Sequence, residues 1–143
     1  MKTGTRSRNV AFEAKRKILY IAQKMTMDSD NIYIEQLKAS LSKLDPYLVL
    51  LFGSYAYGKP HKDSDIDLLV VTNDNYIPNF NEHSQLYLKI SKEIRSIKKQ
   101  IAIDLIVHTL PMYQKFIEQN SLFANEITTK GKIIYESNHT TVA

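Results

Sequence analysis

Three aspartates lie inside or beside apolar segments, where charged residues are uncommon. Asp65 and Asp67 open the run DIDLLVV, and Asp104 interrupts the run IAIDLIV. Strand side chains alternate between faces, so Asp65 and Asp67 point to the same side, with Cβ atoms about 7 Å apart. These carboxylates repel each other, and an unpaired Asp104 in a buried strand would be costly. Neither run contains a basic residue, whereas a divalent cation can bind several carboxylates at once.

Each aspartate taken alone has a simpler explanation. Asp65 can be a turn or cap residue after Ser64, and Asp104 can be a buried acid that is hydrogen-bonded to the backbone or to His108. Asp67 is harder to explain in this way because it lies one residue inside the predicted strand. The need for three separate explanations favours a shared metal site.

A glycine-serine loop precedes the first two aspartates. Gly53 and Ser54 follow the apolar run YLVLLF, and Gly58 comes four residues after Ser54. Glycine lets backbone N–H groups approach a phosphate closely, the serine hydroxyl is a further donor, and a helix starting here would direct its positive end at the anion. The segment GSYAYG is also compatible with an ordinary tight turn, and it lacks the Gly-Lys-Ser/Thr ending of a P-loop.

The spacing of these residues resembles a known signature. Gly53-Ser54, ten intervening residues and Asp65-Ile66-Asp67 resemble the G-S-x10-D-x-D motif of the DNA polymerase β-type nucleotidyltransferase superfamily, and Asp104 resembles its third carboxylate. The likeness is strongest to the small minimal nucleotidyltransferases, which include antitoxins that act on HEPN-domain toxins. The resemblance implies an α/β (α+β) fold, with a small mixed β-sheet flanked by helices.

The resemblance also implies a reaction and a set of residue roles. The reaction is the Mg²⁺-dependent transfer of a nucleoside monophosphate, in our hypothesis AMP from ATP, to a hydroxyl group of an acceptor such as a HEPN-type partner protein. The catalytic residues, which would also bind two Mg²⁺ ions, are Asp65, Asp67 and Asp104. The nucleotide-binding residues are Gly53, Ser54, Lys62 and Ser64.

Two other functions stay open. The chain could be an antitoxin or binding subunit that acts mainly by contact with its partner, because larger nucleotidyltransferases add a separate acceptor domain and few residues remain here outside the core. Direct nucleic-acid binding is not favoured. Residues 1–17 hold six basic residues and one acid, which gives this segment a net charge of +5. The whole chain has a net charge of +4, so the remaining residues together carry −1. A short basic terminus is typically a solvated tail.

Apolar spacing predicts the elements that position these residues. Amphipathic helices are expected at 10–25, 34–44 and 86–97, and Asp45-Pro46 should end the second. Short helices are expected at 112–120 and 121–130, with Pro111 in a first turn and Gly131 at a C-cap. Continuous or alternating apolar residues predict strands at 47–52, 65–72, 101–109 and 132–136.

We expect one nucleotidyltransferase domain over residues 1–143, with a flexible basic tail at 1–9, N-terminal helices at 10–45 and a catalytic core at 46–135. The chain has no cysteine, which excludes disulfides, thiolate zinc sites and a cysteine nucleophile. Its longest apolar run, YLVLLF, is far too short to span a bilayer, and the N-terminus lacks the apolar stretch of a secretory signal. We therefore expect a cytoplasmic protein without membrane association.

Overall fold

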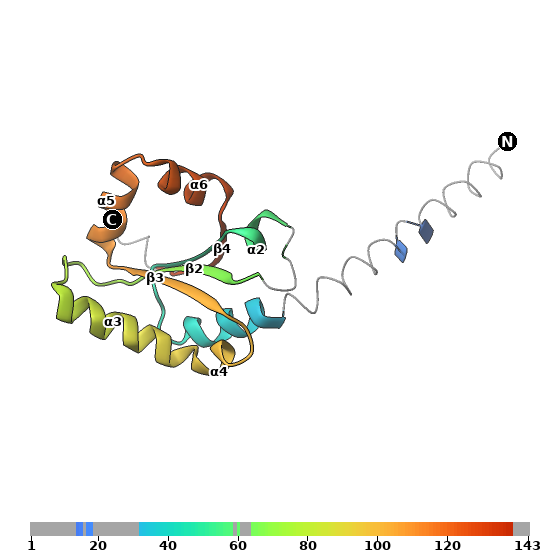
Figure 1. The fold of residues 1–143 in the computed structure, drawn as a ribbon, viewed down its shortest axis with the longest axis horizontal. Helices are drawn as coiled ribbons and strands as arrows, with labels where there is room; N and C mark the ends of the chain where they lie inside the picture. The colour runs from blue at the N-terminus through green and yellow to red at the C-terminus, as the bar shows by residue number, and fades with distance from the viewer. Residues whose placement is uncertain (1–13, 16, 19–31, 59, 61–63, 139–143) are drawn as a thin grey trace. The chain divides into compact units, whose positions relative to one another are not determined.

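The computed structural model describes residues 14–15, 17–18, 32–58, 60 and 64–138 and divides the chain into two compact units, 1–35 and 36–143. The described residues of the first unit are helical, and the rest of the helix predicted at 10–25 lies outside the described residues, as does the basic tail. The second unit contains every strand of the described chain (Figure 1). The single domain over 1–143 stays a prediction.

The second unit is built on a mixed four-stranded sheet with the order β3-β2-β1-β4. β1 (Leu48–Phe52) pairs antiparallel with β2 (Ile66–Val71) and with β4 (Lys132–Glu136). β3 (Ile103–His108) pairs parallel with β2 at one edge. All four predicted strands are present, although β2 and β3 begin slightly later than predicted. The predicted α/β class with a small mixed sheet is confirmed.

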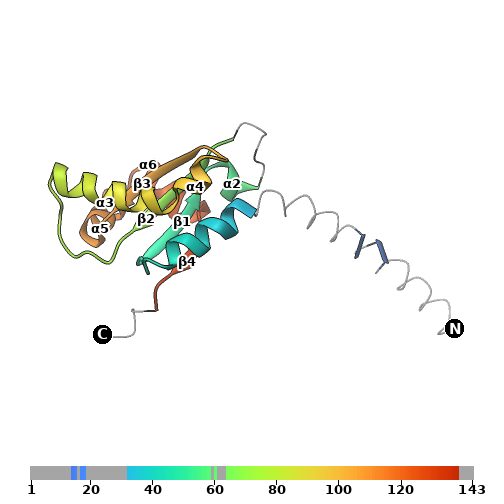
Figure 2. The ribbon, with the colours of Figure 1, turned by 90° about the horizontal axis from the view of Figure 1, so that it is seen from below.

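Helices cover both faces of this sheet. Figure 1 shows α3 (Phe80–Glu93) and α4 (Arg95–Lys98) below the sheet, and α5 (Leu110–Glu118) and α6 (Leu122–Lys130) above it. The helical residues 36–42 lie in the lower layer beside α4, which is also clear in the view from below (Figure 2). A single turn, α2 (Ser54–Tyr57), joins β1 to β2 at one end of the sheet.

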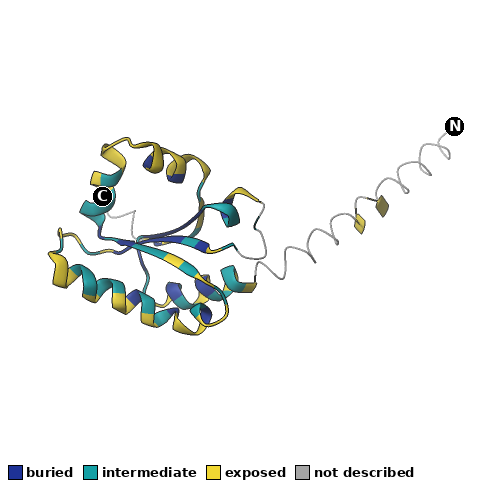
Figure 3. Cartoon of the chain, viewed as in Figure 1, coloured by how far each residue is buried: buried dark blue, intermediate teal, exposed yellow. Residues whose placement is uncertain are grey.

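The core lies on both faces of the two central strands, because β1 is buried over its whole length and β2 over all but Asp67 (Figure 3). Alternate residues of a strand face opposite layers. The buried cluster on the α5–α6 side consists of Leu48, Leu50, Phe52, Leu69, Val71 and Ile127. The buried helical residues of the lower layer are Leu37, Leu41, Ile90, Ile94 and Ile97.

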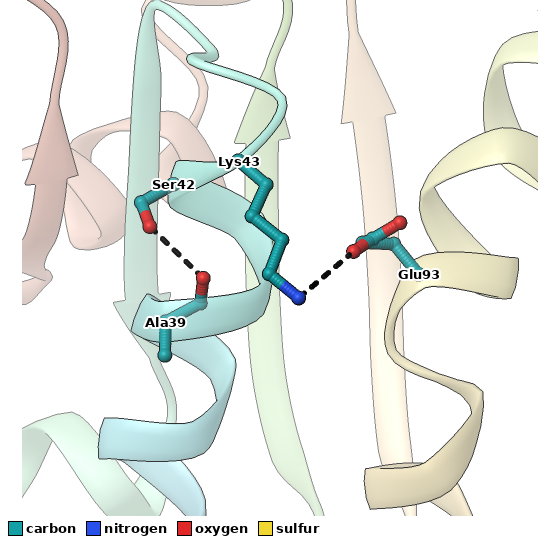
Figure 4. Close-up of polar contacts among 4 residues, drawn as sticks. All are labelled: Ala39, Ser42, Lys43 and Glu93. Carbon is teal, nitrogen blue, oxygen red and sulfur yellow. Dashed lines mark hydrogen bonds and ion pairs between the residues drawn. The ribbon is translucent and has the colours of Figure 1, made fainter.

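The helix that ends at residue 42 is held in place by burial of its apolar side chains more than by charge. Lys43 and Glu93 form an ion pair with a 4.0 Å separation, and Ser42 Oγ donates to the carbonyl of Ala39 at 2.9 Å (Figure 4). An exposed ion pair of this kind contributes at most about 1 kcal/mol. Leu37 and Leu41 are fully buried, so the apolar stripe predicted for this helix is the stronger attachment.

The third helix begins earlier than its apolar spacing predicts. α3 starts at Phe80 because Asn79 and Glu82 form a capping box, in which Asn79 Oδ1 accepts from the N–H of Glu82 at 2.8 Å and Glu82 Oε1 from that of Asn79 at 3.0 Å. The first turn is exposed, so it carries no apolar periodicity. The same predicted helix is interrupted at Ile94, where α4 begins.

None of the helices in the described part of the chain combines the length and apolarity needed to cross a membrane.

Truncating the centre of β2 should destabilise the sheet. We expect Leu69→Ala to lower the free energy of unfolding by about 2–5 kcal/mol, because Leu69 is 0% exposed and truncation leaves a cavity. Urea denaturation followed by circular dichroism measures this loss. Leu122→Ala is the matched control, since Leu122 is 91% exposed and its truncation should change stability by less than about 0.5 kcal/mol. Equal effects would contradict the core assignment.

Candidate active site

Parallel pairing brings two of the predicted aspartates side by side. Asp67 is the register partner of Asp104, and neighbouring strands lie about 4.8 Å apart. Asp65 directly precedes β2 and is exposed. The three residues therefore meet where β2 and β3 begin, which is the end of the sheet that also carries α2 (Figure 1).

The expectation that Asp104 is a buried carboxylate is wrong. β3 is an edge strand, and Asp104 is exposed on it. Water can solvate this carboxylate, so its position in an apolar sequence run does not by itself require a compensating cation. The close neighbour is what makes Asp104 unusual, because its strand partner at the same level is another acid.

The pKa of the Asp67 carboxyl is raised above its usual value. Partial burial is the largest cause, followed by the negative charges of Asp104 and Asp65 and by a hydrogen bond with Asp104. Two like charges at this separation favour either a shared proton or a bound cation. The structure therefore concentrates negative charge at the start of β2.

These carboxylates provide the oxygen ligands that a magnesium ion prefers, but they do not form a complete set of protein ligands around it. Within the described ranges, no three His, Cys, Asp or Glu side chains are grouped so that they could hold a metal ion. Mg²⁺ does not require such a group, because it usually binds one or two carboxylates and completes its shell with water and substrate phosphate oxygens. Asp67 and Asp104 provide such a pair, and the exposure of Asp104 leaves water free access.

Gly53 connects the glycine-serine loop to Asp67. Phe52 is the register partner of Asp67, so Gly53 follows immediately at the same level. Gly53 has a φ of 69°, and a Cβ atom at this position would collide with the Asp67 carboxylate. The position therefore needs glycine both for its backbone conformation and for the close approach of the carboxylate.

The remaining predicted nucleotide-binding residues are only partly placed. Ser54 begins α2, where the N–H groups of Ala56 and Tyr57 donate to the Gly53 carbonyl at 3.0 and 3.1 Å. Because α2 is only four residues long, the helix dipole expected at this loop is small. Ser64 is half-buried next to Asp65, and Lys62 lies outside the described residues.

The loop adjoins Tyr57 and two residues that the sequence did not single out, Glu126 and Lys130. Tyr57 ends α2, and the Nζ atom of Lys130 in α6 lies 5.7 Å from the centroid of its ring. The pKa of Tyr57 is raised above its usual value. Burial is the largest cause and the charge of Glu126 the next, the Gly53 backbone offsets part of the shift, and the charge of Asp67 adds to it. The spacing of Glu126 and Lys130 predicts that they share a face of α6, but not that this face meets α2.

Aromatic side chains hold α6 next to this end of the sheet. The ring of Phe123 makes edge-on contacts with the rings of Phe52 and of Phe116 in α5. The ring centroids are 5.7 Å apart in the first pair and 5.8 Å apart in the second. Ala124 and Ile127 are the buried residues of α6. Since Phe52 directly precedes Gly53, this packing attaches α6 to the strand that carries the loop.

The polymerase β nucleotidyltransferase family model (Polymerase beta, Nucleotidyltransferase) matches residues 35–140, about three quarters of the chain. The fold is thus that of a nucleotidyltransferase, and the chain belongs to the polymerase β nucleotidyltransferase family. The resemblance to this superfamily, drawn from the Gly-Ser and Asp-x-Asp spacing, is confirmed.

A relative in Methanocaldococcus jannaschii carries the name "Putative protein adenylyltransferase MJ1379" and is 32% identical over 75 residues, which cover 52% of this chain and 73% of the relative. Among solved structures, a chain from a "toxin-antitoxin with AMP-PNP" is similar with 22% identity, 73% coverage of each chain and a TM-score of 0.44. A chain from a complex of the tri-AMPylated Shewanella oneidensis HEPN toxin with an MNT antitoxin is similar with 18% identity, 72% coverage of each and a TM-score of 0.39. Family membership rests on the family model and the archaeal relative.

A methyl group at Gly53 should disturb the site more than one at Gly58. Both glycines have positive φ angles, of 69° and 96°, but a Cβ at Gly58 would meet no atom within 4 Å. We expect Gly58→Ala to cost about 1–2 kcal/mol of unfolding free energy through backbone strain, and Gly53→Ala to cost more. The excess should shrink in the double variant Gly53→Ala/Asp67→Ala, which removes the colliding carboxylate. Additive effects in this double-mutant cycle would rule out the contact.

Removing the charge of Asp104 should change the pH dependence of stability in metal-free protein. Because the folded-state pKa of Asp67 is raised, the folded protein binds more protons than the unfolded chain, and stability falls as pH rises through that range. Asp104→Asn removes one cause of the raised pKa, so the fall should be smaller and stability at pH 7 higher. Thermal unfolding from pH 4 to 8 measures this effect. Glu118→Gln, an exposed charge on α5, is the control, and a wild-type profile in Asp104→Asn would contradict the pairing.

Proposed function

We propose that this protein transfers AMP from ATP to a hydroxyl group of an acceptor protein, with two Mg²⁺ ions shared by the Asp67–Asp104 pair and the neighbouring Asp65 and with their coordination completed by water and phosphate oxygens. The observation that carries the proposal is the register pairing of Asp67 with Asp104, together with the approach of the Gly53 backbone to the Asp67 carboxylate. The paired carboxylates and the glycine-serine loop thus share one end of the sheet. The archaeal relative supports the choice of AMP and of a protein acceptor, because its name describes the transfer of an adenylyl group to a protein.

In this proposal the loop and the carboxylates bind different parts of the nucleotide substrate. Gly53 and Ser54 bind the β- and γ-phosphates, since they directly follow the end of β1 that pairs with Asp67. Ser64 and Lys62 line the nucleotide from the segment before Asp65. When bound, Mg²⁺ neutralises charge on the phosphate oxygens. Catalysis then consists mainly of orientation and charge stabilisation rather than a covalent enzyme intermediate.

Asp104 is the best placed of the three acids to accept the acceptor's proton. It lies on an edge strand and is exposed, so a hydroxyl from another molecule can approach it. The acceptor oxygen bonds to the α-phosphorus, the bond from that phosphorus to the β-bridging oxygen breaks, and pyrophosphate leaves. The hydroxyl proton passes to the Asp104 carboxylate.

The acceptor in this proposal is a partner protein, and a HEPN-type protein is the first candidate to test. The motif residues resemble those of minimal nucleotidyltransferases, in which HEPN-domain proteins are partners. In the described residues, the second unit is a single sheet with its helices, and in this proposal the acceptor approaches the surface around the exposed Asp104.

ATP labelled at the α-phosphate should label a co-expressed HEPN-type protein when Mg²⁺ is present, and EDTA should abolish the labelling. We expect Asp67→Asn and Asp104→Asn each to reduce the rate at least about 100-fold, because each removes charge that orients the reacting groups. Asp74→Asn, beyond the opposite end of β2, is the matched control and should retain activity. Full activity of both site variants would refute the proposal.

The same preparation separates modification from contact. If the partner binds equally well to the wild type and to Asp67→Asn without nucleotide, and no labelled product forms, the protein acts by contact and the transferase proposal fails. Labelling that depends on both the aspartates and ATP supports transfer whether or not a stable complex forms.

A further inference from the structure

The surroundings of the Gly53 loop are strongly acidic. Asp65, Asp67 and Asp104 lie at the starts of β2 and β3, and Glu126 of α6 lies close enough to Tyr57 for its negative charge to raise the pKa of the tyrosine. A nucleoside triphosphate is itself a polyanion, and phosphates that extend beyond bound metal ions would meet this negative charge. A cation on the α2 side of the loop would offset the repulsion.

Lys130 is a cation that the structure places on this side. It ends α6, and its Nζ atom lies 5.7 Å from the centroid of the Tyr57 ring, within the range of a cation–π contact. The backbone N–H of the same tyrosine donates to the Gly53 carbonyl at 3.1 Å. One residue therefore contacts the loop backbone through its main chain and the ammonium group through its ring.

The position of Lys130 is fixed from several sides. Ile127, one turn earlier in α6, is 1% exposed, and the N–H of Gly131, the next residue, donates to the Ile127 carbonyl at 2.9 Å. Tyr57 is 40% exposed, so the ammonium rests on a ring that remains open to solvent and to a ligand. A lysine held on an exposed aromatic ring loses less freedom when it binds an anion than a lysine on a solvated loop.

We propose that Lys130 binds the polyphosphate chain of the nucleoside triphosphate and thereby makes the site prefer the triphosphate to the monophosphate. This inference rests on the proposed function and adds a residue to it from outside the Gly-Ser and Asp-x-Asp segments. The Tyr57 ring acts as a positioning group for the ammonium. Glu126, four residues earlier on the same helix, repels the phosphates electrostatically and so weakens their binding.

A purely structural role for Lys130 makes different predictions. A lysine in the last turn of a helix also stabilises the helix dipole, by about 0.3–1 kcal/mol at an exposed site. Loss of that contribution would lower stability without distinguishing ATP from AMP. Affinities for the two nucleotides, measured on the same folded variant, therefore separate the roles.

The experiment is isothermal titration of the full chain with ATP and with AMP in the presence of Mg²⁺. Lys130→Ala should weaken ATP binding about tenfold, the expected size of a lost charge-assisted contact, and leave AMP binding unchanged. Lys132→Ala, an exposed lysine of β4, is the matched control and should bind both nucleotides as the wild type does. Lys130→Arg keeps the charge and should keep most of the ATP preference.

Two further variants test the geometry. Tyr57→Phe keeps the ring and should bind ATP about as tightly as the wild type, because the contact between the ring and the Lys130 ammonium is retained. Tyr57→Ala removes the ring and should weaken ATP binding in the same direction as Lys130→Ala. Glu126→Gln should tighten ATP binding, because it removes a negative charge that repels the phosphates. This change is opposite to the weakening expected for Lys130→Ala.

The outcomes are distinguishable. Equal ATP affinity in the wild type and Lys130→Ala overturns the inference but leaves the proposed function intact. Parallel losses of ATP and AMP affinity with reduced thermal stability show a structural role and also overturn it. A wild-type protein that does not prefer ATP to AMP contradicts both the inference and the proposed function.

Discussion

The pairing of Asp67 with Asp104 is the interaction on which the rest of the site depends. A parallel ladder between β2 and β3 holds two carboxylates at one level, although their charges repel. The sheet tolerates this repulsion because the residues of β2 that follow Asp67 are buried and fix the strand in register. The resulting excess of negative charge favours a cation, and the phosphate chemistry proposed here follows from that charge.

The antiparallel pairing of β1 with β2 adds the second half of the site. It sets Phe52 opposite Asp67, so that the chain must turn immediately beside the carboxylate. Gly53 satisfies this constraint, because only a residue without a Cβ fits both the positive φ and the close contact. The Gly-Ser loop and the Asp-x-Asp strand are thus two sides of one packing contact.

The edge position of β3 keeps its acid accessible to solvent. An interior strand would bury its acid behind a neighbour, whereas β3 leaves Asp104 open to solvent. On the other side, the aromatic contacts of Phe123 attach α6 to the end of β1 and bring Lys130 to Tyr57. The candidate site therefore lies between an open strand edge, where Asp104 is exposed, and a helix that carries Lys130.

The sequence alone determined the strands, the α/β class, the Gly53-Ser54 loop and the three aspartates, because apolar periodicity and motif spacing are local properties of the chain. It misjudged the environment of Asp104, since an apolar run reads the same in an edge strand as in a central one. It also missed the early start of α3, where a capping box replaces apolar spacing. Only the tertiary structure decided which acids are neighbours and that α6 meets α2, because strand order and helix packing depend on contacts between residues far apart in the chain.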